Sequence, residues 1–276
     1  MIRLAVRVRR RDAELALAEL LPLAPGGVEE RDLGDRVEYA IYGAPGELPE
    51  LPELRAAAGD AVVEVVSSEV PDDWEQRWRQ FHRPVEIGSR LRVRPPWEPS
   101  RGGLPEVVID PGPAFGTGAH PTTRLCLELL LELEPRGPVL DLGCGSGVLA
   151  IAAARLGWAP VGAADHDRAA VRATADNARA NGVEVDVRHA DLRDDPPPFP
   201  AGAGSLVLAN LLRPLLLALA SRLREPVPDA LIAGGLLREQ ADEVAAAFAQ
   251  HGLRPELRRD EDDWSALLLC DTRGAR

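Results

Sequence analysis

The amino-acid sequence predicts an α/β protein built on a parallel sheet and preceded by a small α+β domain. From Val107 onward, short apolar runs alternate with helical patterns, which implies a parallel sheet with helices on both faces. Before that point the elements follow in the order strand, helix, strand, strand, helix, strand, which is the order of a ferredoxin-like domain. The length of 276 residues also favours two domains.

Residues 1–70 form the predicted small domain. Apolar side chains and arginines alternate from Ile2 to Arg9, which is the period of a half-buried strand. Asp12 is placed to cap a helix with a stripe of leucines, and Gly34-Asp35 predicts a hairpin turn. The remaining elements are a strand from Arg36 to Tyr42, a helix from Glu50 to Ala58 and a strand from Ala61 to Ser67. No catalytic constellation lies here, so we interpret the domain as a recognition module; the alternative is a purely stabilising one.

Residues 71–105 are predicted to connect the two domains. Trp74, Trp78 and Phe81 recur at i, i+4 and i+7, which predicts a helix that buries one aromatic face. Apolar positions alternate from Val85 to Arg94, where Pro95-Pro96 ends the pattern, and the stretch from Glu98 to Pro105 predicts an exposed loop.

The large domain is predicted over residues 106–276. Its strands are expected at 107–109, 139–141, 161–165, 183–189, 206–209 and 230–233, and its helices at 122–133, 147–156, 168–181, 213–223 and 238–251. A last strand, at about 264–270, lacks a following helix, so we expect it to run antiparallel at the edge of the sheet.

A glycine-rich turn is the most informative feature of the large domain. Residues 139–147 read Val-Leu-Asp-Leu-Gly-Cys-Gly-Ser-Gly, an apolar strand that ends in an acid and is followed by a glycine at every second position. A dinucleotide fingerprint needs its third glycine three places after the second, and Val148 stands there. The glycines Gly143, Gly145 and Gly147 therefore predict a nucleoside cofactor without a pyrophosphate, rather than a tight loop alone.

Acidic residues at the strand ends narrow the choice of cofactor. Asp141 would repel a phosphate but suits a cationic amino acid, and Asp165 ends the next strand where a ribose-binding carboxylate is expected. S-adenosylmethionine carries a sulfonium and an ammonium and no phosphate, so it fits both positions. Asp167 is an alternative to Asp165, and Asp191 is a candidate partner for the adenine amino group or an ordinary turn acid.

Three further stretches follow the same strand ends. Residues 110–123 read Asp-Pro-Gly-Pro-Ala-Phe-Gly-Thr-Gly-Ala-His-Pro-Thr-Thr, Asn210 follows the apolar run 206–209, and Gly234-Gly235 opens the phrase Gly-Gly-Leu-Leu-Arg-Glu-Gln. Together with the glycine-rich turn, this set resembles the bacterial ribosomal protein L-eleven methyltransferase family over essentially the whole chain. The Phe-Gly-Thr-Gly-x-His-Pro-Thr-Thr loop is the specific part of the likeness.

The resemblance implies a fold and an activity. The fold is a Rossmann-like seven-stranded class I methyltransferase sheet behind a ferredoxin-like substrate domain. The activity is S-adenosylmethionine-dependent N-methylation of lysine side chains and the terminal amine of a large-subunit ribosomal protein. By the same resemblance, cofactor contacts fall on Thr123, Gly143, Asp165 and Asn210, and the loop that covers the cofactor on Phe115, Gly116 and Thr117; from the residues themselves we add Asp141, Gly145 and Asp191.

Asn210 is the predicted catalytic residue. Methyl transfer is a single in-line displacement, so the protein must align donor and acceptor rather than supply a nucleophile. The side-chain oxygen of Asn210 is placed to accept an N–H from the amine; alternatively this residue caps the next helix. Arg213, close behind it, departs from the family pattern, as does Ala119. We interpret His120 as structural and Cys144 as a small residue of the turn.

The amino-acid composition indicates which classes of binding partner to expect. The formal net charge is −12 and aromatic residues make up only 4%, which disfavours direct nucleic-acid binding and favours a basic protein as substrate. Three scattered cysteines suggest neither a metal site nor disulfides, and without a leader or an apolar run of about 20 residues we expect a cytoplasmic protein away from membranes. The alternatives are a methyltransferase acting on RNA or a small molecule, and a binding module without turnover.

Overall fold

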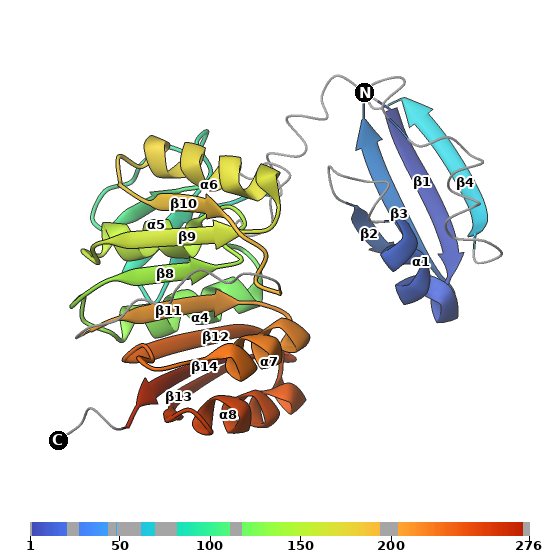
Figure 1. Cartoon of the computed structure of the whole chain (residues 1–276). Helices are drawn as coiled ribbons and strands as arrows, with labels where there is room; N and C mark the ends of the chain where they lie inside the picture. The colour runs from blue at the N-terminus through green and yellow to red at the C-terminus, as the bar shows by residue number, and fades with distance from the viewer. Residues whose placement is uncertain are drawn as a thin grey trace. The chain divides into compact units, whose positions relative to one another are not determined.

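The computed structural model describes residues 2–20, 28–43, 48, 62–69, 82–110, 118–193 and 204–272. The chain forms two compact units, Met1–Phe81 and His82–Arg276, which are considered separately (Figure 1). No helix in these described ranges is long and apolar enough to cross a bilayer. The predicted helix with Trp74, Trp78 and Phe81 lies outside the described residues, as does the predicted helix from Glu50 to Ala58.

The first unit contains an antiparallel sheet in the order β2-β3-β1-β4. Its described elements are β1 (Ile2–Arg9), the 3-10 turn η1 (Arg10–Asp12), α1 (Ala13–Leu20), β2 (Glu29–Asp32), β3 (Arg36–Gly43) and β4 (Val62–Glu69). The predicted hairpin is confirmed, since β2 and β3 pair across residues 33–35. Val6 and Val8 of β1 pack with Leu20 and Tyr39 in one apolar cluster, while Glu38 on the other face is buried between the guanidinium groups of Arg3 and Arg7.

The second unit begins with a three-stranded sheet, β5 (Val85–Ile87), β6 (Leu91–Arg94) and β7 (Glu106–Val108). The prediction that residues 107–109 form a strand of the large sheet is wrong, because β7 pairs in parallel with β6 instead. A three-residue apolar run does not reveal which sheet it joins. On the outer face, Glu106 binds the buried Arg92 (Nη1 to Oε1, 2.9 Å) and Arg94 (Nε to Oε2, 2.8 Å), which ties β7 to β6.

The large sheet has seven strands in the order β10-β9-β8-β11-β12-β14-β13, as the resemblance implies. These strands are β8 (Val139–Leu142), β9 (Val161–Asp165), β10 (Asp186–His189), β11 (Leu206–Asn210), β12 (Ala230–Leu237), β13 (Leu253–Glu261) and β14 (Trp264–Asp271). The antiparallel direction predicted for β14 is confirmed, but its predicted position at the edge is wrong. The strand at this edge of the sheet is β13. It was not predicted from the sequence because charged residues occupy both of its faces.

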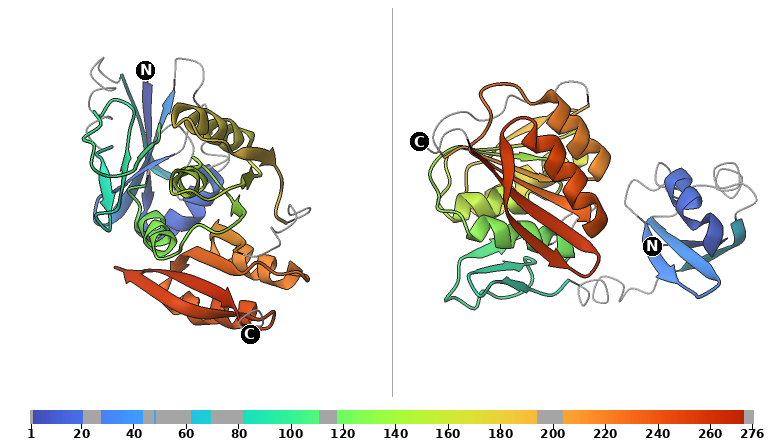
Figure 2. Two further views of the ribbon diagram at one scale, coloured as in Figure 1. Left: turned by 90° about the vertical axis from the view of Figure 1, so that its left-hand side faces the viewer. Right: turned by 90° about the horizontal axis from the view of Figure 1, so that it is seen from below.

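Helices cover both faces of this sheet (Figure 2). They are α4 (Pro121–Leu131), α5 (Val148–Arg155), α6 (Arg168–Ala180), α7 (Arg213–Arg222) and α8 (Ala241–Ala249), the last preceded by the 3-10 turn η4 (Arg238–Gln240). Neighbouring residues of one strand point to opposite faces: Leu208 of β11 packs with α4 and α5, whereas Val207 packs with α7 and α8. The five predicted helices are therefore confirmed, with ends that differ by a few residues.

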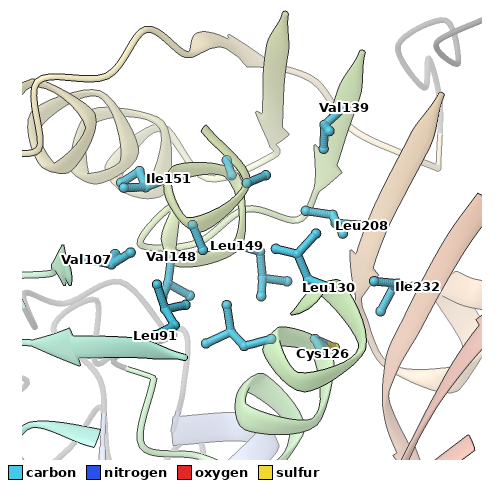
Figure 3. Packing of buried hydrophobic residues seen from close by; sticks show 14 of the residues in the cluster. Leu91, Val107, Cys126, Leu130, Val139, Val148, Leu149, Ile151, Leu208 and Ile232 are labelled. Carbon is cyan, nitrogen blue, oxygen red and sulfur yellow. The ribbon is translucent and has the colours of Figure 1, made fainter. Parts of the chain in front are cut away.

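The small sheet is held to the large one through helices. Figure 3 shows Leu91 of β6 and Val107 of β7 beside Val148 of α5, with Leu130 of α4 and Leu208 of β11 in the same cluster. Burial of one such leucine or valine stabilises the fold by about 1.5–3 kcal/mol. Residues 82–110 are thus an integral layer of the second unit.

Candidate functional site

A cavity of about 620 Å³ lies at the carboxyl ends of the parallel strands. These strands are parallel, but β9 and β10 are added on one side of β8 and β11 and β12 on the other, so the strand order reverses between β8 and β11. Ligands of open α/β sheets bind at this reversal. The polar and glycine positions of the lining are His120, Thr122, Gly143, Asp165, His166, Asp191, Arg193, Asn210 and Gly235. The cavity thus gathers four of the predicted site residues: Gly143, Asp165, Asp191 and Asn210.

The glycine-rich turn joins β8 to α5 in a conformation that other residues do not favour. Gly143, Gly145 and Gly147 have φ angles of 70°, 54° and 82°. A Cβ atom on Gly143 would lie 2.3 Å from Cδ2 of Leu211, which also lines the cavity. The turn therefore exposes bare backbone on its cavity side.

The carboxylate of Asp165 is fixed at the end of β9. Its side chain is buried, and its Oδ2 accepts the N–H of Gly145 at 3.0 Å while its Oδ1 accepts the N–H of Asp167 at 2.9 Å. Each carboxylate oxygen can accept a second hydrogen bond, so Asp165 keeps acceptor capacity at Oδ2, while Nδ1 of the exposed His166 lies 3.2 Å from Oδ1. Asp167, the alternative, instead caps α6 by accepting the N–H of Ala169.

Asp141 lies beneath the turn rather than in the cavity lining. Only 2% of it is exposed, and its Oδ2 accepts the N–H of Ala150 in the first turn of α5. Burial disfavours the charged form and raises the pKa of Asp141 to about 7, although the Ala150 bond acts in the opposite direction. Gly145 is likewise absent from the lining and acts through Asp165.

Asn210 ends β11 inside the cavity lining. Its Nδ2 lies 3.4 Å from the hydroxyl oxygens of both Thr122 and Thr123 in α4. Its Oδ1 is buried next to Gly234 and has no hydrogen-bond donor among the described residues. The following helix α7 has Leu212 at its N-cap, with no side-chain cap, so the alternative role of Asn210 as a helix cap does not hold.

Asp191 reaches the cavity from the segment after β10. Arg193 binds both carboxylate oxygens, through its Nε at 3.0 Å and a guanidinium nitrogen at 2.7 Å. This pairing holds the pKa of Asp191 well below its usual range. Arg213 does not line the cavity, and its guanidinium pairs with Glu243 of α8.

The rest of the wall is apolar and aromatic. Leu192, Leu211, Leu212 and Leu215 line it together with Trp264 of β14. The ring of Trp264 packs edge-on against His120, with 5.1 Å between ring centroids. His120 caps α4 by accepting the N–H of Thr122 at Nδ1, and burial lowers its pKa. Its interactions support the structural role that the sequence suggests.

A polar stripe on α6 was not predicted from the sequence. Thr174 and Asn177 of α6 and Asn181 at its C-cap recur at i, i+3 and i+7, and they hydrogen-bond the glycine-rich turn and β7. Three uncharged polar residues on the inner face of an amphipathic helix were the available signal.

Phe115, Gly116 and Thr117 lie outside the described residues. Within the described part of the chain, no three His, Cys, Asp or Glu side chains gather at metal-binding spacing.

Known proteins resemble this chain in sequence. The sequence model of the family described as ribosomal protein L11 methyltransferase (PrmA) matches residues 51–271. The ribosomal protein L11 methyltransferase of Symbiobacterium thermophilum is 41% identical over an alignment of 205 positions that covers 71% of this chain and 65% of that protein. The one from Bordetella bronchiseptica is 37% identical over an alignment of 280 positions, gaps included, that covers 87% of this chain and 89% of that protein.

The fold agrees with these sequence matches. A crystal structure of ribosomal protein L11 methylase from Lactobacillus delbrueckii subsp. bulgaricus has a TM-score of 0.62 and 27% identity to this chain, covering 69% of this chain and 99% of that one. The match to the Symbiobacterium relative spans just under two thirds of that protein's length. The chain belongs to the ribosomal protein L11 methyltransferase family.

Proposed function

We propose that this chain binds S-adenosylmethionine in the cavity and transfers its methyl group to amines of a large-subunit ribosomal protein. The amines are lysine side chains and the terminal amine, and the substrate is the ribosomal protein L11 that the relatives' names state. One observation carries the proposal: Gly143, Asp165 and Asn210 converge on one cavity where the strand order reverses. A ribosomal protein substrate implies a cytoplasmic enzyme.

The chemistry of the cavity suits this cofactor. The remaining acceptor capacity of Asp165 suits a hydroxyl group of a ribose, and a side chain at Gly143 would fill space next to Leu211. Asp165 and Asp191 would repel a pyrophosphate, and Arg193 is already engaged by Asp191. When bound, S-adenosylmethionine supplies a methyl group on a positively charged sulfur.

Positioning and deprotonation of the amine are the tasks left to the protein. A lysine amine has a pKa of about 10.4 and attacks only after losing a proton, and burial next to a positive charge favours the neutral form. Asn210, lying at the end of β11 with an unsatisfied oxygen, would accept an amine N–H after rotation of its amide and aim the lone pair. The amine nitrogen that Asn210 orients would receive the methyl group from the bound cofactor, and the proton that the ammonium loses beforehand would pass to solvent.

The small unit is proposed as the module that recognises the ribosomal protein. Its strand order, β2-β3-β1-β4, is that of a ferredoxin-like sheet. We retain the functional division into residues 1–70 for recognition, 71–105 for connection and 106–276 for catalysis as part of this proposal.

Methylation of ribosomes with tritiated S-adenosylmethionine tests the proposal. Ribosomes from cells lacking the enzyme would be incubated with the full chain and then separated into protein and RNA. We expect label in one large-subunit protein; label confined to RNA would overturn the substrate class. An Asn210→Ala variant should lose most turnover even when the cofactor is saturating, because the substitution removes the proposed acceptor for the amine. Normal turnover of that variant would remove Asn210 from the mechanism.

A further inference from the structure

Helix α6 carries a stripe of buried polar side chains facing the glycine-rich turn. Thr174 and Asn177 are 0% and 4% exposed, and the half-buried Asn181 at the C-cap continues the same face of the helix. Buried polar groups are costly unless hydrogen-bonded. Their partners therefore indicate what the stripe holds in place.

Two residues of the stripe bind carbonyl groups of the turn. The hydroxyl of Thr174 donates to the carbonyl oxygen of Gly145 at 3.0 Å, and the Nδ2 of Asn177 donates to that of Ser146 at 2.9 Å. Asp165 holds the N–H of Gly145 from the opposite side. Side chains from β9 and α6 thus hydrogen-bond the peptide groups of the turn. These bonds fix the orientation of the turn's backbone.

Asn177 also reaches a second segment. Its Oδ1 accepts the N–H of Asp110, two residues past β7, at 3.0 Å. Asn181, one turn further along α6, binds both backbone groups of Val108 but contacts no residue of the turn. Asn177 is therefore the member of the stripe that joins the turn to the end of β7, while Asn181 bonds β7 and the carbonyl oxygen of Asn177 in its own helix.

We propose that Asn177 is a positioning residue for cofactor binding, which couples the shape of the glycine-rich turn to the end of β7. This inference rests on the proposed function, because it assigns the turn to S-adenosylmethionine. It adds a residue from α6, outside the cavity lining, that controls how tightly the donor binds without touching the acceptor amine.

Paired substitutions in the full-length enzyme test the inference. In Asn177→Asp the carboxylate still accepts the N–H of Asp110 but offers no donor to the carbonyl of Ser146. In the matched control Asn181→Asp, a donor to the carbonyl of Val108 is lost in the same way, away from the turn. Dissociation constants for S-adenosylmethionine from calorimetry, and KM and kcat for methylation, are measured beside the denaturation midpoint.

We expect Asn177→Asp to raise the dissociation constant and the cofactor KM about tenfold, the scale of one lost hydrogen bond, with kcat within about twofold. Asn181→Asp should leave both within about twofold despite a similar loss of stability. Equal effects of the two variants, or wild-type affinity in Asn177→Asp, would overturn the inference. If Asn177→Asp does not fold, Thr174→Val, which removes the hydroxyl contacts to the carbonyl of Gly145 and to the sulfur of Cys144 in the turn, must weaken cofactor binding in the same direction. Failure of the unmodified enzyme to bind S-adenosylmethionine would instead refute the proposed function.

Discussion

The carboxylate of Asp165 holds the backbone N–H of Gly145 at 3.0 Å, so the acid that ends β9 also shapes the turn that follows β8. The same side chain accepts the N–H of Asp167 through its other oxygen. A single residue therefore aligns two neighbouring strand ends and presents its remaining acceptor sites to the cavity. This dual role makes Asp165 the most sensitive point of the proposed cofactor site.

Asp165→Asn should weaken S-adenosylmethionine binding by roughly 10- to 100-fold. The amide cannot accept from both Gly145 and Asp167, and a hydrogen bond to a charged group is worth about 1.5–3 kcal/mol. Calorimetric titration measures the change. Asp167→Asn is the matched control, since Asn caps a helix as well as Asp does. The assignment of Asp165 fails if both variants bind like the unmodified enzyme.

Gly235→Ala should destabilise the fold more than Gly102→Ala does. Both glycines have positive φ, 77° and 65°, which costs another residue about 1–2 kcal/mol. A Cβ at Gly235 would also lie 2.5 Å from the carbonyl oxygen of Leu211, whereas nothing lies within 4 Å of one at Gly102. Urea denaturation of both variants measures the difference. Equal losses would show that close packing at Leu211 is not what requires Gly235.

The buried acid Asp141 should make stability depend on pH. Its folded pKa of about 7 lies above the value of about 3.9 in an unfolded chain. The folded state therefore binds this proton more tightly, and the resulting stabilisation is complete below about pH 4 and is lost as pH rises through about 7. Asp141→Asn keeps an acceptor for the N–H of Ala150 but cannot titrate.

Denaturation free energies at pH 5, 6, 7 and 8 test this expectation. Relative to the unmodified protein, Asp141→Asn should become progressively more stable as pH rises, by up to a few kcal/mol. Asp191→Asn serves as the control, because the carboxylate of Asp191 lies partly in solvent, paired with Arg193. Parallel pH curves for the unmodified protein and Asp141→Asn would contradict the raised pKa.

Sequence reasoning identified most elements of the large domain because their signals are local. The apolar run before Gly143 and the leucine stripe of α4 are each complete within a dozen residues, and the acid at position 165 directly ends its strand. Asp165, Asp191 and Asn210 were singled out by their places at strand ends and Gly143 by the glycine-rich turn, and the resemblance implied the cofactor contacts of Gly143, Asp165 and Asn210.

The errors came from features that depend on distant partners. Strand β7 pairs with β6, where Glu106 binds two arginines of that strand, and a three-residue apolar run carries no sign of this distant partner. Strand β13 has charged residues on both faces and is specified by its pairing with β14. Asn177 and Asn181 read as ordinary helix residues until the backbone groups that they bind, 31 and 73 positions away, are brought next to them.

Calorimetric titration of the full-length chain with S-adenosylmethionine, beside a parallel titration with NAD, tests the central claim most directly. The account predicts saturable one-to-one binding of S-adenosylmethionine that Asp165→Asn weakens, and no binding of the pyrophosphate-containing dinucleotide. Binding of NAD at this cavity, or no heat with S-adenosylmethionine, would contradict it.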